Sequence, residues 1–369
     1  MSEYFKSKSS LPMDWPMLGT ILIICVVGLA NLYSSTFDLS ISKYFTQQIF
    51  WMLIGFLFLT VFVLLDYHLF YRFSYPIYIA TVLSLILVLI IGKSSQGSQR
   101  WIHIAGITIQ PSEIAKIGVV IFLARYFHTH REQKRLSISS LASPLFFTLI
   151  PFLLILKQPD LGTALIVLFT SITMFWFAGI QRKIILISII AVLCTAPITW
   201  KYGLKPYQKD RVVSFLNPEK YAYGKGYQII QSKIAIGSGQ FSGKGYLEGS
   251  QSKLQFLPKQ HTDFVFSNYA EEFGFLGSIL LFFLYIVLFL MGLNIASSAK
   301  EVFGMMLAFG LTASLACQTI INLGMETGLL PVVGMTLPLF SYGGTSLLSS
   351  MIALGIILSI SLRRPAYSS

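Results

Sequence analysis

The chain has 369 residues, of which 54% are hydrophobic and only 11% are charged, and its formal net charge is +12. A water-soluble domain usually carries about a quarter charged residues, so we expect lipid to be the main solvent. The basic residues lie between apolar runs, which excludes a nucleic-acid binder and suits anionic lipid head groups or pyrophosphates. The three cysteines each lie in an apolar run without metal-ligand spacing, so we expect no cysteine-bound metal.

Ten apolar runs have the length, about 17–25 residues, that crosses a hydrocarbon core as a helix. The expected spans are 17–36, 48–65, 74–92, 111–127, 141–156, 162–178, 184–200, 269–293, 303–322 and 345–362. They predict an all-α polytopic integral membrane protein of about ten helices, with a single membrane domain over 1–369. The first run is too long for a cleavable signal peptide and is expected to remain as a span.

The connecting segments differ in charge between the two sides of the membrane. An even number of spans places both ends on one side, and the short loops of that side hold most of the Lys and Arg residues. The positive-inside rule therefore predicts that both termini are cytoplasmic. The long basic segment 201–268 is exempt from the rule, and we expect it to form a large extracytoplasmic loop between spans seven and eight.

The segment before the fourth span combines a helix start with paired charges. Pro111 and Ser112 are typical of a helix start, and Glu113 follows in the first turn, where the helix dipole favours an anion. Glu113 and Lys116 are three residues apart, so they share one helical face and can pair. Either the pair holds helices together, or it marks a cavity or substrate site, as charges within spans often do.

Asp160 stands at the head of the sixth span, after Gln158 and Pro159. An N-cap role for the new helix and a functional role are both open. We keep Asp160 as a candidate substrate-binding residue because we expect it on the same outer side as Glu113.

The long segment opens with the cations Lys205, Lys209 and Arg211, which are candidates for binding phosphate. Residues 227–236 have apolar residues at helical spacing and predict an amphipathic helix that lies on the membrane surface. The glycines of 237–245 predict a mobile turn with an exposed backbone, and no Walker loop is present.

Asp263 closes the long segment as a carboxylate flanked by aromatic residues, where the chain re-enters the membrane. It can serve as a general base, or it can simply cap the eighth span. His261 also invites a catalytic interpretation, but a lone histidine beside a membrane surface more often orients a site through hydrogen bonds, and we keep it among the candidate substrate-binding residues. Glu271 and Glu272 are expected in the first turn of span eight, as partners of the helix dipole.

Residues 323–344, between the last two spans, are apolar but interrupted by Gly and Pro. Irregular backbone at membrane depth is tolerated only where protein or a water-filled cavity covers it. We therefore expect a re-entrant extracytoplasmic segment, with a kinked linker as the alternative.

Five motifs in this order resemble the SEDS family (shape, elongation, division and sporulation), and within it the members that act in cell elongation. The motifs are Arg100-Trp101 with Gln110-Pro111-Ser112-Glu113, Gln158-Pro159-Asp160-Leu161-Gly162, Tyr207-Gln208 through Pro218, His261-Thr262-Asp263-Phe264, and Gly328 through Ser346. The resemblance implies a peptidoglycan glycosyltransferase of the bacterial cytoplasmic (inner) membrane that polymerises lipid II, with Asp263 as the essential catalytic residue. It also implies a class B penicillin-binding protein as partner within the elongation machinery, and a divalent cation.

The hypothesis for the chemistry is that Asp263 accepts the proton of the attacking sugar hydroxyl. Lys116, Lys205, Lys209 and Arg211 are the candidate cations for the pyrophosphate, and Mg²⁺ or Mn²⁺ bridging it to Asp263 or Glu113 is a further expectation. The alternatives are a lipid II flippase and a noncatalytic scaffold. A flippase needs a polar path across the membrane, whereas the candidate carboxylates all map to one side.

Overall fold

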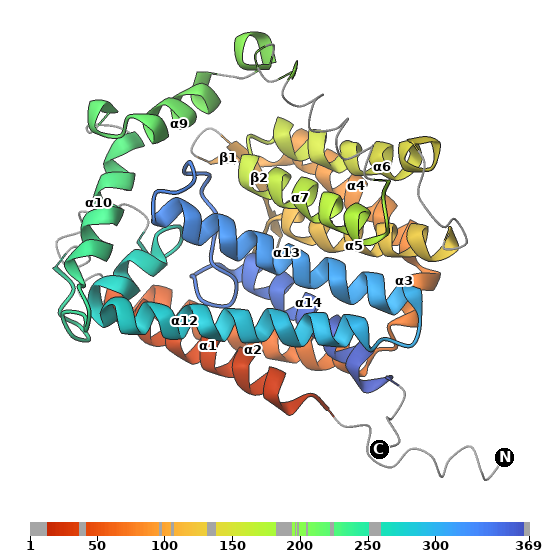
Figure 1. Ribbon diagram of the computed structural model, residues 1–369, viewed down its shortest axis with the longest axis horizontal. Coiled ribbons are helices and arrows are strands. Elements are labelled where there is room, and N and C mark those ends of the chain that lie inside the picture. The colour runs from red at the N-terminus through yellow and green to blue at the C-terminus, as the bar shows by residue number, and fades with distance from the viewer. Residues whose placement is uncertain are drawn as a thin grey trace.

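The computed structural model of the chain describes a helical bundle (Figure 1). The described residues are 13–36, 42–95, 98–104, 107–130, 138–181, 194–195, 197, 199–203, 206–221, 225–250 and 260–364. Long apolar helices dominate this part of the chain, as the sequence predicts for an all-α membrane protein. The backbone polar groups of such helices are satisfied within each segment, which is what a lipid solvent requires.

Nine helices of the described part coincide with nine of the ten expected spans. They are α1 (Trp15–Ser35), α2 (Ser42–Leu64), α4 (Ser74–Ile91), α5 (Pro111–Thr129), α6 (Ile138–Lys157), α7 (Leu161–Phe177), α12 (Val265–Ser297), α13 (Val302–Glu326) and α14 (Gly344–Leu362). Seven of them are long and apolar enough to cross a membrane, and α7 is a shorter apolar helix. The expected span 184–200 lies largely outside the described residues.

Helix α5 lies inside the bundle and packs against α4, α7 and α13. Most of its side chains are buried by these neighbours and not by lipid. This position explains why a less apolar helix can be a span, because Glu113 and Lys116 near its start face protein.

Helices α2 and α14 approach each other closely (Figure 1). A Cβ atom at Gly355 would lie 2.8 Å from the carbonyl oxygen of Leu59, and one at Gly55 would lie 3.1 Å from the Met351 side chain. Small residues at such crossings increase van der Waals contact, which drives helix association where lipid is as apolar as the side chains.

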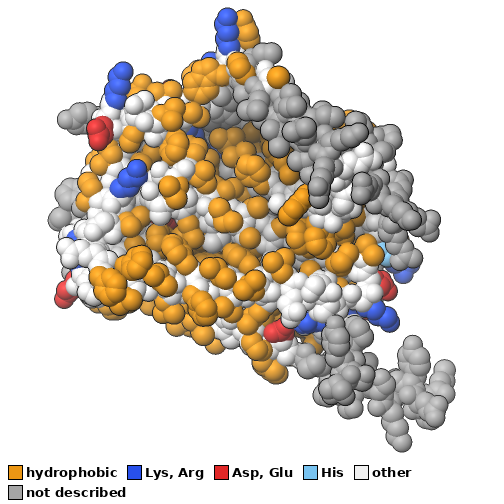
Figure 2. Space-filling view, in the orientation of Figure 1, with side chains coloured by type: hydrophobic (Ala, Val, Ile, Leu, Met, Phe, Trp, Pro, Cys, Tyr) orange, Lys and Arg blue, Asp and Glu red, His pale blue; other side chains and the backbone are white. Residues whose placement is uncertain are grey.

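The outer face of the bundle is hydrophobic (Figure 2). Along α12, Phe275, Leu280, Phe283 and Leu290 are all more than half exposed. In Figure 2 the charged side chains lie mostly at the margins of the view. A continuous apolar face is expected for a surface that lipid covers.

Both described ends of the chain lie at the same end of the bundle. Arg364, after α14, pairs with Asp14, which caps α1, at 3.1 Å. Arg363 lies 3.6 Å from Asp66, between α2 and the short helix α3 (His68–Arg72). The two termini therefore lie on one side, as the charge pattern predicts, whereas the membrane face that they occupy stays a prediction.

A small antiparallel sheet joins α4 to α5, which the all-helical prediction did not include. Its strands are β1 (Lys93–Ser95), β2 (Ser98–Ile104) and β3 (Ile107–Ile109), in the order β1-β2-β3. Ile102 of β2 pairs with Ile109 of β3, so the hairpin leads directly into Pro111 at the start of α5.

The long segment contains α9 (Pro206–Leu216), the short 3₁₀ helix η2 (Glu219–Tyr221) and α10 (Lys225–Ser238), preceded by the π-helical turn η1 (Thr199–Gly203). The predicted helix is confirmed as α10, and its position on the membrane surface stays a prediction. It packs against α12 and buries Ile229, Ser232 and Ala235. Periodicity identifies the apolar face of a helix but not what covers it.

The glycine turn after α10 is docked on α12, so the expected exposed backbone is wrong. The amides of Lys244 and Gly245 donate to the carbonyl oxygens of Glu271 and Glu272 at 3.0 and 3.1 Å. At Gly274, φ is 64° and ψ is −158°, which kinks α12 where the turn lies against it. Such a conformation favours glycine.

Helix α12 begins at Val265, earlier than the expected 269. Glu271 and Glu272 therefore lie in the second turn, and their predicted place in the first turn is wrong. Both are buried: Glu271 accepts from Lys244 at 2.6 Å, and Glu272 accepts from Ser34 of α1. They tie the docked turn and α1 to α12, because a buried carboxylate needs partners.

Residues 327–343 form an irregular segment between α13 and α14 that is exposed at Leu329 and largely buried from 333 onward. Val333, Leu337, Leu339 and Phe340 are each at most 2% exposed. Protein thus covers this irregular backbone, as the membrane environment requires. Helix α13 occupies the first part of the expected re-entrant segment 323–344, and re-entry into a membrane stays a prediction.

Candidate active site

Asp263 lies half-buried on the turn that leads into α12. Its carbonyl oxygen accepts from the Asn322 amide at 3.3 Å, and its carboxylate lies against Gly334, where a Cβ atom would come within 3.3 Å of Oδ2. Glycine at 334 thus leaves room for the carboxylate at the edge of the 327–343 segment. Asp263 lies two residues before the start of α12, and its place at the membrane boundary stays a prediction.

His261 is held by aromatic neighbours from distant segments. Its ring centroid lies 4.7 Å from that of Tyr44 and 6.0 Å from that of Tyr342. The amide of Tyr342 donates to the His261 carbonyl oxygen at 3.0 Å. These contacts fix the turn two residues before Asp263 and support the interpretation of His261 as an orienting residue.

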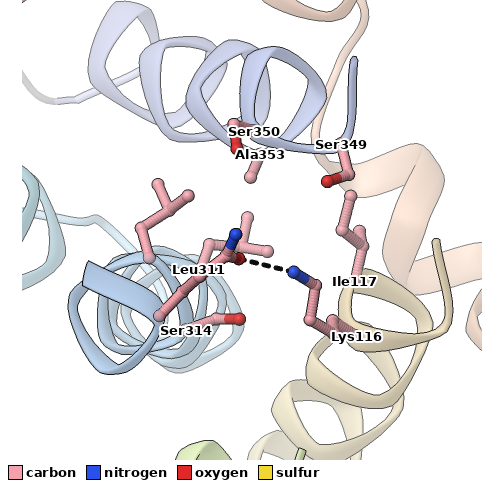
Figure 3. A pocket seen from close by; sticks show the side chains of 9 residues that line it. Lys116, Ile117, Leu311, Ser314, Ser349, Ser350 and Ala353 are labelled. Carbon is pink, nitrogen blue, oxygen red and sulfur yellow. Dashed lines mark hydrogen bonds between the residues drawn. The ribbon is translucent and has the colours of Figure 1, made fainter. Parts of the chain in front are cut away.

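Glu113 and Lys116 form the predicted ion pair on α5, with Nζ 2.9 Å from Oε2. Each residue is only 6% exposed. Lys116 also donates to Gln318 of α13 at 2.6 Å (Figure 3), and Ser349 of α14 donates to Glu113 at 2.8 Å. The pair thus joins three helices, because each buried charge needs both a counter-charge and a hydrogen-bond partner.

A small cavity lies beside Lys116, between α5, α13 and α14 (Figure 3). Its polar lining includes Ser314, Gln318 and Ser350. Its volume is about 10 Å³, which is close to the space that one water molecule needs. The cavity can therefore hold a water molecule but not a sugar.

Asp160 is buried and its carboxylate is shared between several partners. It caps α7 through the Thr163 amide at 3.4 Å, which confirms the N-cap interpretation. It also accepts from Gln110 at 2.8 Å and from Ser112 at 3.1 Å, and it lies 3.7 Å from the Arg100 guanidinium. This network joins β2, α5 and α7, and a substrate-binding role for Asp160 stays a prediction.

One face of α13 connects the ion pair with the Asp263 turn. Gln318, the acceptor for Lys116, donates to the Thr336 carbonyl oxygen at 2.9 Å. One turn later, Asn322 donates to the Met335 carbonyl oxygen at 2.7 Å as well as to Asp263. Both amides therefore satisfy carbonyl groups that the irregular segment leaves unpaired.

The polar residues on this face of α13 were not predicted as site residues from the sequence. Gln318, Asn322 and Glu326 recur at intervals of four in an apolar span. That spacing places polar groups on one helical face, which marks a face turned toward protein and away from lipid.

The predicted cations of the long segment lie apart from the ion pair. Lys209 and Arg211 are on α9, which packs against α10 and stands away from α5 in Figure 1. Lys209 donates to the Lys201 carbonyl oxygen at 3.3 Å. Lys205 lies outside the described residues. The structure thus groups Glu113 with Lys116 on α5 but does not bring α9 to them.

The donors for a divalent cation are few in the described part of the chain. No group of three or more His, Cys, Asp or Glu side chains that could hold a metal ion occurs there. Lys116 and Ser349 both bind Oε2 of the buried Glu113, and its role as a metal ligand stays a prediction. The half-buried Asp263 fits the weaker requirement of Mg²⁺, which takes one or two carboxylates and completes its shell with water and phosphate.

Comparison with known proteins identifies the same family that the five sequence motifs resemble. The model of the FtsW/RodA/SpoVE family, described as cell cycle protein, matches residues 11–365. The chain is 42% identical over 292 residues to the peptidoglycan glycosyltransferase MrdB of Escherichia coli K12, which covers 79% of this chain and 78% of that protein. It is 32% identical to the peptidoglycan glycosyltransferase RodA of Treponema pallidum, over 95% of this chain and 98% of that protein.

Two solved structures are similar over nearly the whole chain. One belongs to a study of polymerization and crosslinking by a peptidoglycan synthase complex, with a TM-score of 0.83 at 33% identity, covering 98% of this chain and 100% of that one. The other is the rod shape determining protein RodA of Thermus thermophilus, with a TM-score of 0.72 at 28% identity, covering 97% and 98%. With a family model that matches almost every residue, the chain belongs to the FtsW/RodA/SpoVE family, which is the SEDS family that its motifs resemble.

Proposed function

We propose that this bacterial peptidoglycan glycosyltransferase uses Asp263 as the general base when it polymerises lipid II into glycan strands during cell-wall elongation. The observation that carries the proposal is the placement of Asp263. Its carboxylate is half-buried at the start of α12, while Asn322, Gly334 and the aromatic neighbours of His261 hold the turn around it. A base needs such a fixed but accessible position.

In the proposed reaction, a sugar hydroxyl of the acceptor attacks the anomeric carbon of the donor. A carbon–oxygen bond forms there as the bond from that carbon to the pyrophosphate oxygen breaks. Asp263 takes the hydroxyl proton, and undecaprenyl pyrophosphate leaves with the bonding electron pair. One carboxylate is enough, because a pyrophosphate leaves without an acid once cations neutralise it, unlike the leaving group of a glycosidase.

The groups that neutralise the pyrophosphate are part of the proposal. Lys205, Lys209 and Arg211 precede or lie in α9, in the same long segment that leads to Asp263. Lys116 is engaged by Glu113 and Gln318, which supports a role in holding the site together. A Mg²⁺ or Mn²⁺ ion bound with Asp263 as a ligand would supply further positive charge to the leaving group.

The proposal also includes the orientation of the chain in the membrane and its partner protein. Both termini are cytoplasmic, which is supported by the Arg364–Asp14 pair at one end of the bundle and by the basic short loops of that side. The Asp263 end then faces outward, where the sugars of lipid II lie in water. The partner is a class B penicillin-binding protein, which crosslinks the new strands within the elongation machinery.

A lipid II flippase is the second candidate, and the structure gives it less support. The polar groups around Lys116 are paired with one another across three helices. The cavity beside them measures about 10 Å³, far below what a disaccharide head group needs.

The test is polymerisation of labelled lipid II by the purified full-length chain, alone and with the penicillin-binding partner. We expect Asp263→Ala and the isosteric Asp263→Asn to reduce glycan formation at least about 100-fold, because both remove the base. Glu219→Ala, which removes an exposed carboxylate of the same long segment, is the matched control and should retain activity. Equal glycan product from wild type and both Asp263 variants refutes the catalytic assignment. Lipid II flipping in proteoliposomes without polymer favours the flippase.

A further inference from the structure

Glu326, the last residue of α13, is a completely buried carboxyl group beside the Asp263 turn. Its Oε2 atom accepts from the backbone amide of Ser267 at 2.7 Å and from the Ser267 hydroxyl at 2.8 Å. Its Oε1 atom has no hydrogen-bond partner. Burying a carboxyl oxygen without a hydrogen-bond partner costs free energy, so the position of Glu326 requires an explanation.

The amino-terminal end of α12 explains why the carboxyl group is there. Helix α12 has Phe264 as its N-cap residue, with no side-chain cap and no acidic residue in its first turn. The first turn of a helix leaves backbone amides without helical partners. Glu326 accepts from one of them, the amide of Ser267. It thus supplies, from another helix, the cap that α12 lacks.

The same junction is fixed by two further side chains. The Ser232 hydroxyl of α10 contacts the Ser267 hydroxyl at 2.6 Å and donates to the Glu326 carbonyl oxygen at 2.6 Å. Asn322 lies one turn before Glu326 on α13 and donates to the Asp263 carbonyl oxygen. Helix α13 therefore binds both ends of the five-residue stretch from Asp263 to Ser267.

We propose that Glu326 is a positioning residue for the glycosyl transfer: from the end of α13 it caps α12 and so fixes the turn that presents the Asp263 carboxylate. The inference rests on the proposed function, in which Asp263 is the base. A misplacement of about 1 Å at a reacting group can cost on the order of 100-fold in rate.

The role depends on hydrogen-bond acceptance and not on charge. The donors to Glu326 Oε2 are the neutral amide and hydroxyl of Ser267. These donors need an acceptor oxygen at this place and not a negative charge. The amide oxygen of a glutamine can accept the same bonds from Ser267, whereas alanine cannot.

The experiment compares Glu326→Ala and Glu326→Gln in the full-length chain with its partner, measuring kcat and KM for lipid II and hydrogen exchange of the peptide that contains Phe266 and Ser267. For Glu326→Ala we expect kcat to fall about 10- to 100-fold with KM within about twofold of wild type, because the base is displaced while the substrate still binds. Exchange at 266 and 267 should accelerate. For Glu326→Gln we expect kcat within about threefold of wild type and normal exchange.

Glu248→Ala, which removes an exposed carboxylate of the docked turn, is the matched control and should match wild type in both measurements. The proposal is overturned by a Glu326→Ala variant with wild-type kcat, by unchanged exchange in that variant, or by a Glu326→Gln variant as impaired as the alanine. Failure of the proposed function is read separately. If Asp263→Ala polymerises normally, Asp263 is not the base, whereas the exchange data still report on the cap.

Discussion

Lys116 allows the sharpest test of how the buried ion pair stabilises the bundle. Lys116→Met keeps a side chain of similar shape but removes the ammonium group from Glu113, which is 6% exposed. The carboxylate then retains Ser349 as its donor but loses its counter-charge. Removing one partner of a buried pair typically costs about 3–5 kcal/mol, because the remaining charge stays buried without compensation. We expect a loss of that size in the free energy of unfolding.

The double variant Lys116→Met/Glu113→Gln separates the charge from the packing. With both charges removed, no uncompensated charge stays buried. The expected loss in the free energy of unfolding therefore falls to about 1–2 kcal/mol. Lys300→Met, at an exposed lysine between α12 and α13, is the matched control and should lie within about 0.5 kcal/mol of wild type. The measurement is the reversible unfolding of the purified chain in mixed micelles of rising SDS fraction. A single variant within about 1 kcal/mol of wild type refutes the reasoning, as does a double variant as unstable as the single.

Three further predictions use the same unfolding assay. Asp160→Ala should cost about 3 kcal/mol, because it removes the α7 cap, the acceptor for Gln110 and the counter-charge of Arg100, whereas Asp160→Asn should recover part of the loss. Gly274→Ala should cost at least about 2 kcal/mol, since φ is positive there and a Cβ atom would collide with Gly243, while Gly237→Ala, in open space on α10, should be neutral or stabilising by up to about 1 kcal/mol. Although partial burial opposes it, the pKa of Asp66 is lowered by hydrogen bonds from His68 and by the charge of Arg363. Its contribution to stability should therefore be present above about pH 4 and be lost as the pH falls further, and Asp66→Asn should remove this loss.

The spans could be predicted from the sequence because a lipid solvent leaves few choices. A segment without water must satisfy its own backbone, so hydropathy alone locates most helices. The start of α12 was missed because Phe264, Val265 and Phe266 belong to the preceding polar motif in the sequence, although they already lie at the head of the helix. The hairpin before α5 was missed because its strands are too short for alternation to be recognised.

The neighbours that cover a helix face or a carboxylate could not be predicted from the sequence. The periodicity of α10 marks an apolar face, and lipid and protein cover such a face equally well. Only the fold shows that Ile229 and Ala235 meet α12. Likewise, the sequence predicts Glu271 as a partner of the helix dipole. In the structure it holds the docked glycine turn through Lys244 and Ser250.

The Glu113–Lys116 ion pair and the Asp263 turn are both held by helix α13. Irregular backbone at membrane depth leaves carbonyl groups that need donors, and Gln318 and Asn322 supply them to Thr336 and Met335. The same two side chains accept from Lys116 and donate to Asp263. The charge of the ion pair and the position of the proposed base are therefore linked through one turn of α13 and the segment that it holds. Substitutions at the two ends should not have additive effects on the reaction, because contacts in one network couple.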